Sequence, residues 1–141
     1  MSIDVIYQAR ATATGGRDGR VQTEDGTLDL SLGMPKALGG SGVGANPEQL
    51  FAAGYAACFL SALKLVGSQQ GHAKALTDAT LKATVGIGPR PDKGFGLVVE
   101  LVAAIPGLER SIAETLVNEA DQICPYSQAV RGNISVTLKV A

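Results

Sequence analysis

The strongest constraint in this sequence is the stretch over residues 46–70, which predicts a long helix. Asn46, Pro47 and Gln49 suit the N-cap, N1 and N3 positions, and Gly71 suits the residue just beyond a helix end. Residues 50–60 are apolar on nearly every side, and many of them are Ala or Gly, which permits close approach by another element. A chain of 141 residues with short strands covers such a helix incompletely. A second subunit is the expected cover, which predicts a homodimer.

Alternating apolar residues predict strands around this helix. Asp25-Gly26 indicates a hairpin turn, and Leu28, Leu30 and Leu32 are expected to face the core. A second helix opens at Pro106-Gly107 and ends at Cys124-Pro125. The predicted strands cover residues 5–13, 20–24, 27–32, 81–87, 95–105 and 134–140. The order βββ-α-ββ-α-β indicates one α+β domain over residues 1–141, with a hairpin-rich sheet folded around helices.

Composition argues against several classes of function. The net charge is −1 and there is no Trp, which disfavours nucleic-acid binding. The first ten residues have neither a basic nor an apolar region, so we expect no signal peptide. The apolar stretch over residues 50–60 is too short to span a bilayer. We therefore expect a cytoplasmic protein without a membrane segment, and in that compartment a disulfide is more often catalytic than structural.

Two cysteines lie in unequal contexts. Cys58 is inside the apolar helix, and Cys124 directly precedes a proline, where the α conformation is disfavoured. This is the layout of an attacking thiol and a resolving thiol. From the residues alone, however, two inert buried cysteines remain the more common interpretation.

Other chemistries have little support in the sequence. His72 is the single histidine, and it follows a helix-ending glycine in a polar stretch, so we expect it to be solvated. The Cys, His and carboxylate spacing does not suit zinc. The segment GGSGVG over residues 39–44 lacks the pattern of a nucleotide-binding loop and is expected to be flexible backbone.

A buried thiol needs a cation to become a thiolate. Arg17, in the turn over residues 15–19, is a candidate cation, although an exposed turn arginine would look the same. Glu48, at the start of the predicted helix, is a second charged candidate, although a carboxylate there is also explained by its favourable interaction with the helix dipole.

Six segments of the sequence together closely resemble the organic hydroperoxide resistance (Ohr) proteins of the Ohr/OsmC family of thiol peroxidases, and this resemblance favours the catalytic interpretation of both cysteines. The resemblance runs in order along essentially the whole chain. Its segments are GGRDGR (15–20), NPEQLFAAGYAACF (46–59), VGIG (85–88), GFGL (94–97), IPGLER (105–110) and CPYSQAVRGNI (124–134).

The resemblance implies a role for each candidate residue. Cys58 matches the peroxidatic cysteine and Cys124 the resolving cysteine, while Arg17 matches the arginine that holds the thiolate and Glu48 the carboxylate that orients it. It further implies an intertwined homodimer with two long central helices and interfacial active sites. The implied reductant is a dithiol, the dihydrolipoyl group of a lipoylated protein, and no metal, haem or flavin is implied.

The implied reaction converts an organic hydroperoxide into an alcohol while Cys58 passes through a sulfenic acid to a disulfide with Cys124. Apolar residues near the thiol are expected to favour a substrate with a hydrocarbon tail. These residues are Phe59, Phe51, Leu50 and Met34.

Helix geometry adds an argument that does not depend on the family. Glu48 and Cys58 are ten residues apart, which is about 15 Å along a straight helix. Either the helix breaks between them, or Glu48 and Arg17 serve Cys58 of the other subunit.

Three alternatives stay open at this point. The first is an OsmC-like peroxidase with broader substrates that include hydrogen peroxide. The second is a non-enzymatic redox sensor that reacts once and signals to a partner. The third is a structural small-molecule binder with inert cysteines.

Overall fold

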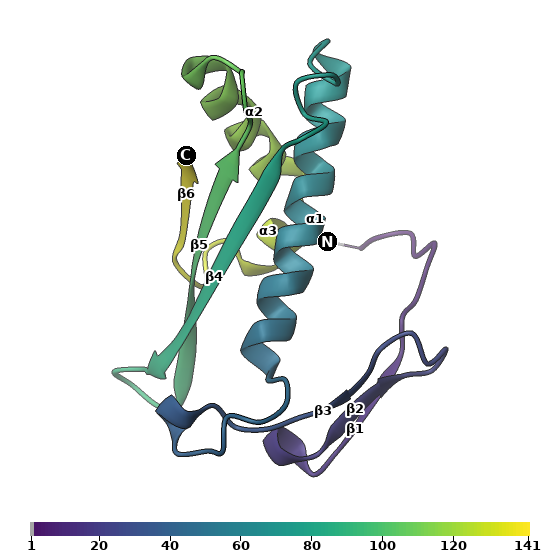
Figure 1. Cartoon of the computed structure of the whole chain (residues 1–141), viewed down its shortest axis with the longest axis vertical. Coiled ribbons are helices and arrows are strands. Elements are labelled where there is room, and N and C mark those ends of the chain that lie inside the picture. The colour runs from purple at the N-terminus through teal and green to yellow at the C-terminus, as the bar shows by residue number, and fades with distance from the viewer. Residues whose placement is uncertain (1) are drawn as a thin grey trace. The chain divides into compact units, whose positions relative to one another are not determined.

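The computed structural model describes residues 2–141, which fall into two compact units, one ending at Leu50 and the other spanning Phe51–Ala141. Each unit contains a three-stranded sheet, and the long helix α1, Pro47–Gln69, begins in the first unit and continues in the second. The α+β class with a long helix is confirmed (Figure 1). That the chain is a single domain stays a prediction.

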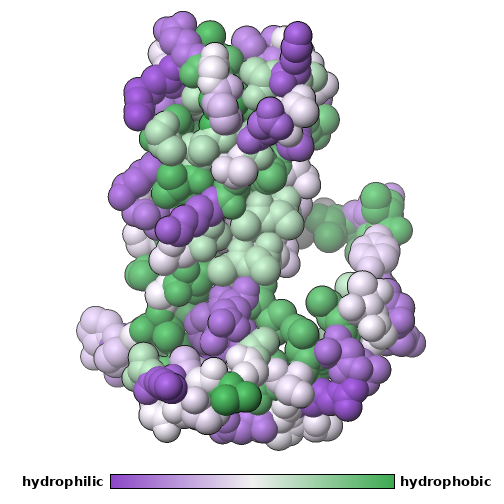
Figure 2. Space-filling model, in the orientation of Figure 1, coloured by the Kyte–Doolittle hydropathy of each residue, from purple (hydrophilic) through white to green (hydrophobic). Residues whose placement is uncertain are grey.

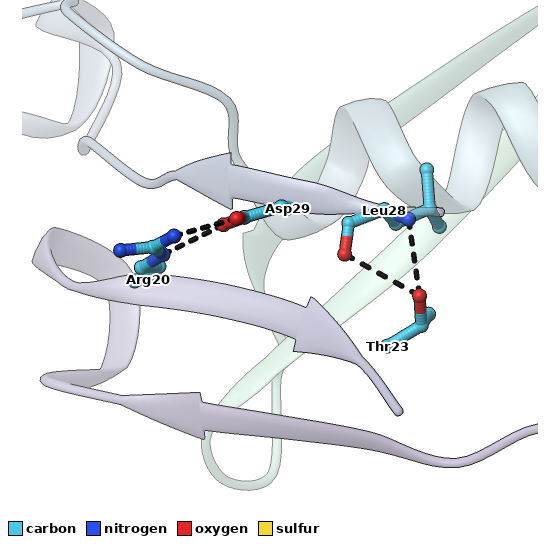
Figure 3. A network of polar contacts seen from close by, with 4 residues as sticks. All are labelled: Arg20, Thr23, Leu28 and Asp29. Carbon is cyan, nitrogen blue, oxygen red and sulfur yellow. Dashed lines mark hydrogen bonds and ion pairs between the residues drawn. The ribbon is translucent and has the colours of Figure 1, made fainter. Parts of the chain in front are cut away.

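The first unit is built on an antiparallel meander of β1 Ala11–Thr14, β2 Arg20–Thr23 and β3 Asp29–Ser31. The hairpin predicted at Asp25-Gly26 is present, and Gly26 has the positive φ of 75° that its turn requires. Two side-chain contacts brace it (Figure 3). Arg20 donates two hydrogen bonds to Asp29, and the Thr23 hydroxyl bonds to the backbone of Leu28.

The prediction of a strand over residues 5–13 is wrong for most of that range. Pairing between β1 and β2 starts at Ala11 opposite Thr23, with one further bond from the Glu24 amide to the Arg10 carbonyl. The partner strand then turns away at Asp25-Gly26, so the segment before Arg10 has nothing to pair with in that sheet. Leu28 is also exposed rather than facing the core, while Leu30 and Leu32 are half-buried.

The ends of α1 are fixed as the sequence predicts. The Gln49 amide donates to Oδ1 of Asn46 at 2.9 Å, and the Asn46 amide donates to Oε1 of Gln49 at 3.1 Å, which is a reciprocal capping box. At the other end, the amides of Gly71 and His72 bond back to the carbonyls of Ser68 and Gly67. This is a Schellman motif with Gly71 at a positive φ of 82°.

The second unit has a sheet in the order β4-β5-β6, from β4 Thr80–Pro89, β5 Phe95–Ala104 and β6 Val136–Val140. β4 and β5 form the expected hairpin, and β6 joins β5 in parallel. Helix α2, Arg110–Ile123, begins three residues after Gly107, which lies in a turn with φ of 80°. A short helix, α3 Pro125–Val130, follows at once, although the sequence predicted only an end to α2 there.

Residues of α1, β5 and α2 form one buried cluster, so the two helices cover one face of the second sheet. From α1 this core contains Tyr55, Phe59, Ala62, Leu63 and Val66. Gly67 lies so close to Leu76 that a Cβ at position 67 would stand 1.9 Å from a Leu76 methyl carbon. The helix is therefore packed tightly along this side.

The opposite side of α1 is exposed within the single chain. Ala53, Ala57, Ser61 and Leu65 recur at helical spacing along it, and the space-filling view shows apolar surface along the helix (Figure 2). By length and composition α1 would be able to cross a membrane, a test that core helices of soluble proteins also pass. The prediction that the apolar segment is too short to span a bilayer considered only residues 50–60, whereas the whole helix has 23 residues.

Candidate active site

The two cysteines come together in the second unit. Cys58 lies on α1 and is partly buried, whereas Cys124 lies between α2 and α3 and is fully buried. Their sulfur atoms are 3.7 Å apart, and both thiols are free. A disulfide requires about 2.05 Å between the sulfurs. The two thiols are thus in contact and need only a small approach to bond, whereas the sequence interval between them is 66 residues.

Cys124 owes its position to the proline that follows it. Its amide makes the last bond of α2, to the Ala120 carbonyl at 2.9 Å, and its carbonyl accepts the Gln128 amide of α3 at 3.0 Å. Its own φ of −67° and ψ of 121° are extended, as expected before a proline. Pro125 then occupies the first position of α3, where a missing amide hydrogen costs nothing. One residue therefore ends one helix and starts the next, which turns its side chain toward α1.

The environment of Cys58 opposes ionisation. Burial raises the pKa of the Cys58 thiol, since a thiolate loses solvation there, and a hydrogen bond from the Tyr126 amide lowers the pKa in part. Burial dominates, so the second unit by itself does not hold Cys58 as a thiolate. A nearby cation would offset the cost of burial and favour the thiolate.

Three aromatic rings, those of Phe51, Tyr55 and Tyr126, pack against one another in the second unit. Tyr126 packs against Phe51 and Tyr55, with ring centroids 6.2 and 5.7 Å apart. The Tyr126 ring also lies over Gly54, where a Cβ would stand 2.8 Å from its hydroxyl oxygen. Phe51 is half-buried and Tyr126 is 39% exposed, so both present apolar surface. Phe59, by contrast, is fully buried in the core, and the expectation that it contacts a substrate is wrong.

Arg17 and Glu48 form an ion pair in the first unit. Arg17 lies in a 3₁₀ helix, Gly16–Asp18, between β1 and β2, and Glu48 lies in the first turn of α1. Two guanidinium nitrogens each donate to a different carboxylate oxygen at 2.8 Å, a bidentate arrangement. This contact lowers the pKa of Glu48 and raises the pKa of Arg17. Both groups stay charged at neutral pH, and the guanidinium is fixed in orientation.

Glycine is required around Arg17. At Gly19 a Cβ would stand 1.6 Å from the Thr14 carbonyl oxygen, and Gly15 has a φ of 69°. The Met34 amide donates to the Asp18 carboxylate at 3.2 Å and ties this turn to the following loop. The segment GGRDGR therefore presents one arginine on a tightly constrained backbone.

The structure thus pairs the four predicted site residues two by two, Cys58 with Cys124 and Arg17 with Glu48. The sequence did not predict that Tyr55, Ser127 and Tyr126 lie beside the two cysteines. A tyrosine within an otherwise apolar helix, and a serine just after CPY, were the available signals. Among residues 2–141 no group of three or more His, Cys, Asp or Glu side chains is arranged to hold a metal ion.

Comparison with known proteins decides the family. The model of the OsmC-like proteins matches residues 39–139, a range that includes Cys58, Cys124 and Glu48. An organic hydroperoxide resistance protein of Xanthomonas axonopodis pv. citri is 54% identical over 97% of this chain and 96% of its own length. The protein OhrB of Bacillus subtilis is 43% identical over 96% of this chain and 98% of its own length.

The chain belongs to the organic hydroperoxide resistance family of OsmC-like proteins.

Solved structures of the organic hydroperoxide resistance family agree with this assignment. The Legionella pneumophila protein is 49% identical, with a TM-score of 0.92 over 98% of this chain and 99% of its own. The Vibrio cholerae protein, a putative member with captopril bound in one of its active sites, is 52% identical with a TM-score of 0.93, covering 99% of this chain and 95% of its own. The resemblance indicated by the six sequence segments is therefore confirmed. Arg17 lies before the range that the OsmC-like model matches, so its place in the family pattern stays a prediction.

The Arg17–Glu48 pair predicts a pH-dependent contribution to stability. The pKa of Glu48 in the folded protein lies below its ordinary value of 4.5, so the pair stabilises the fold fully above pH 4.5 and less as the pH falls further. Because Arg17 is 36% exposed, we expect about 1 kcal/mol near neutral pH. Urea unfolding of the wild type and Glu48→Gln, at one protein concentration, measures the difference. A gap between the two proteins that stays constant down to acid pH would contradict the ion-pair account.

Proposed function

We propose that this chain is a thiol peroxidase that reduces organic hydroperoxides to alcohols. The observation that carries the proposal is the contact of Cys58 and Cys124 at 3.7 Å, with one thiol partly accessible and the other buried. The names of the relatives support the substrate class, since they are organic hydroperoxide resistance proteins. Two inert structural thiols have no need of this proximity.

The reaction uses both thiols in turn. The Cys58 thiolate attacks the distal peroxide oxygen, the O–O bond breaks, and the leaving alkoxide takes a proton to become an alcohol. Cys58 is then a sulfenic acid. The Cys124 sulfur attacks the Cys58 sulfur, the S–O bond breaks, and the hydroxyl leaves as water, which gives the disulfide. The disulfide protects Cys58 from further oxidation.

Arg17 supplies the cation that the buried thiol lacks. In this proposal its guanidinium stabilises the thiolate and donates to the peroxide oxygens as negative charge develops. Glu48 holds the guanidinium at a fixed angle through the bidentate contact. Because α1 is one continuous helix over Pro47–Gln69, a break between Glu48 and Cys58 does not apply. We therefore assign Arg17 and Glu48 to the Cys58 of the other subunit in a homodimer.

The dimer has independent physical support. The exposed side of α1, with Ala53, Ala57 and Ser61, is small-featured and largely apolar (Figure 2). Two copies of such a face pack closely against each other and remove it from water, which forms an isologous interface with two central helices. The same arrangement brings the site residues of two chains together.

The substrate is an organic hydroperoxide with a hydrocarbon tail. Phe51 and the partly exposed Tyr126 provide the apolar contact that the sequence assigned in part to Phe59. Each methylene buried there contributes about 0.8 kcal/mol, an advantage that hydrogen peroxide lacks. A broader OsmC-like peroxidase would show no such preference.

The disulfide is returned to two thiols by a dithiol reductant of the dihydrolipoyl type on a lipoylated protein, in the cytoplasm. A dithiol suits this site because only one sulfur is accessible. The first reductant thiol attacks at the partly exposed Cys58, and the second then releases the mixed disulfide within the same molecule. No metal, haem or flavin takes part.

Removing each thiol separately tests the proposed function. Cys58→Ser should lose all turnover of tert-butyl hydroperoxide with dihydrolipoamide, because the nucleophile is gone. Cys124→Ser should consume one equivalent to form the Cys58 sulfenic acid, and in excess peroxide at most two more equivalents as Cys58 passes to sulfinic and then sulfonic acid. Peroxide consumption and intact-protein mass spectrometry measure both results.

The wild type is the control for the alternative of a redox sensor. A peroxidase continues to consume peroxide while dithiol lasts, whereas a sensor that signals to a partner reacts once. Sustained turnover by Cys58→Ser, or a single turnover by the wild type with dithiol present, would contradict the proposal.

Sharing of the site between subunits predicts complementation of two inactive chains. Co-expression of Cys58→Ser with Arg17→Ala under different affinity tags gives a heterodimer. If Arg17 serves the other chain, one of its two sites is complete, and activity should be about half that of the wild type. Heterodimers as inactive as the two parent homodimers would show that each chain builds its own site.

A further inference from the structure

Helix α3 is joined to α1 by a buried hydrogen bond beside the thiols. The Tyr55 and Ser127 hydroxyl oxygens are 2.8 Å apart, and the two residues are 0% and 2% exposed. Within residues 2–141 this is the one hydrogen bond between two side chains that links α1 to α3, and the Tyr126 amide adds a backbone bond to the Cys58 thiol. The other polar side-chain contacts of this region run from α3 and Arg131 to α2. They are Gln128 to the Gln122 carbonyl, and Arg131 to Asp121.

The two residues stand in mirrored positions relative to the thiols. Tyr55 precedes Cys58 by three residues on α1, and Ser127 follows Cys124 by three residues at the start of α3. On α1 three residues are nearly one helical turn, so Tyr55 and Cys58 share a face with their Cα atoms about 4.5 Å apart along the axis. Ser127 is the third residue of α3, the helix that Cys124 caps. The contact between the hydroxyls and the contact between the thiols therefore both join α1 to the start of α3.

The two sets of contacts have different effects. The contacts from α3 to α2 hold α3 to the helix that ends at Cys124, and they do not fix the distance from Cys124 to Cys58. The Tyr55–Ser127 bond spans from the Cys58 helix to the helix that Cys124 begins. Its members are kept neutral, since burial raises the pKa of Tyr55 and a phenol in this site stays protonated.

We infer that Tyr55 and Ser127 are positioning residues for the disulfide step, and that their hydrogen bond holds Cys124 within reach of oxidised Cys58. The inference rests on the proposed peroxidase function. In that reaction the Cys58 sulfenic acid has two fates. Attack by the Cys124 sulfur expels water and forms the disulfide, whereas attack on a second hydroperoxide oxidises Cys58 to sulfinic acid and releases a second alcohol. The hydrogen bond favours the first fate.

The prediction concerns the ratio of these two products. Tyr55→Phe and Ser127→Ala each remove one hydroxyl and leave both thiols, Arg17 and Glu48 in place. A neutral hydrogen bond of ordinary net strength corresponds to about a fivefold change in an equilibrium. The concentration of tert-butyl hydroperoxide that converts half of Cys58 to sulfinic acid should therefore fall about fivefold in each variant. The rate at which Cys58 first reacts should change little.

The experiment treats each reduced protein with a series of tert-butyl hydroperoxide concentrations, quenches with a thiol alkylator, and counts disulfide and sulfinic acid by mass spectrometry. Tyr7→Phe and Ser68→Ala are matched controls, because they remove the same groups at exposed positions, Tyr7 being 78% exposed. Both controls should give the wild-type ratio. Thermal unfolding of every protein separates positioning from loss of the fold.

The double variant Tyr55→Phe, Ser127→Ala tests whether the two hydroxyls act through one bond. Its product ratio should match that of the more affected single variant. An additive double effect, an unchanged ratio in folded single variants, or failure of both single variants to fold would each overturn the inference. Failure of the peroxidase proposal looks different, because wild-type Cys58 would then not react with the hydroperoxide.

Discussion

The burial of Cys58 is the constraint on which the rest of this structure depends. Lost solvation raises the pKa of this thiol, and the amide of Tyr126 offsets the increase only in part. In the proposed reaction this burial is useful, since it brings apolar contacts for a hydrocarbon substrate and excludes water. The proposed reaction also requires a cation, which we assign to Arg17 of a second subunit, and a second thiol held close by. The proposed site therefore combines elements far apart in the sequence.

We assign these requirements to two pairs of residues, and the local backbone positions each pair. Proline after Cys124 forces an extended residue between α2 and α3, which brings the second thiol to 3.7 Å from the first. Glycines around Arg17 allow a turn too tight for any side chain, and Glu48 at the capped start of α1 fixes the guanidinium. In the proposed dimer, the exposed side of α1 with its small residues supplies the surface through which a second chain completes the site.

Local signals predicted much of this architecture. The capping box at Asn46 and Gln49, the glycine end at Gly71 and the break at Cys124-Pro125 each depend on neighbours in sequence, and each is present. Errors arose where tertiary context decides. Residues 5–9 have strand-like alternation but pair with no strand within residues 2–141, and Phe59 is adjacent to Cys58 in sequence yet is buried in the core. The Tyr55–Ser127 bond joins residues 72 positions apart, and no local sequence pattern predicts it. The four candidate residues came from family resemblance, because spacing alone did not separate them from inert side chains.

The central claim is that Cys58 and Cys124 work as one redox pair. The most direct measurement is a titration of the reduced wild-type protein with an alkyl hydroperoxide, followed by a count of free thiols and by peptide mapping. The account predicts that one equivalent of hydroperoxide removes both thiols of each chain, releases one equivalent of alcohol, and yields a peptide linked through Cys58 and Cys124. Free Cys124 after complete oxidation of Cys58, or two thiols that survive an equivalent of hydroperoxide, would contradict it.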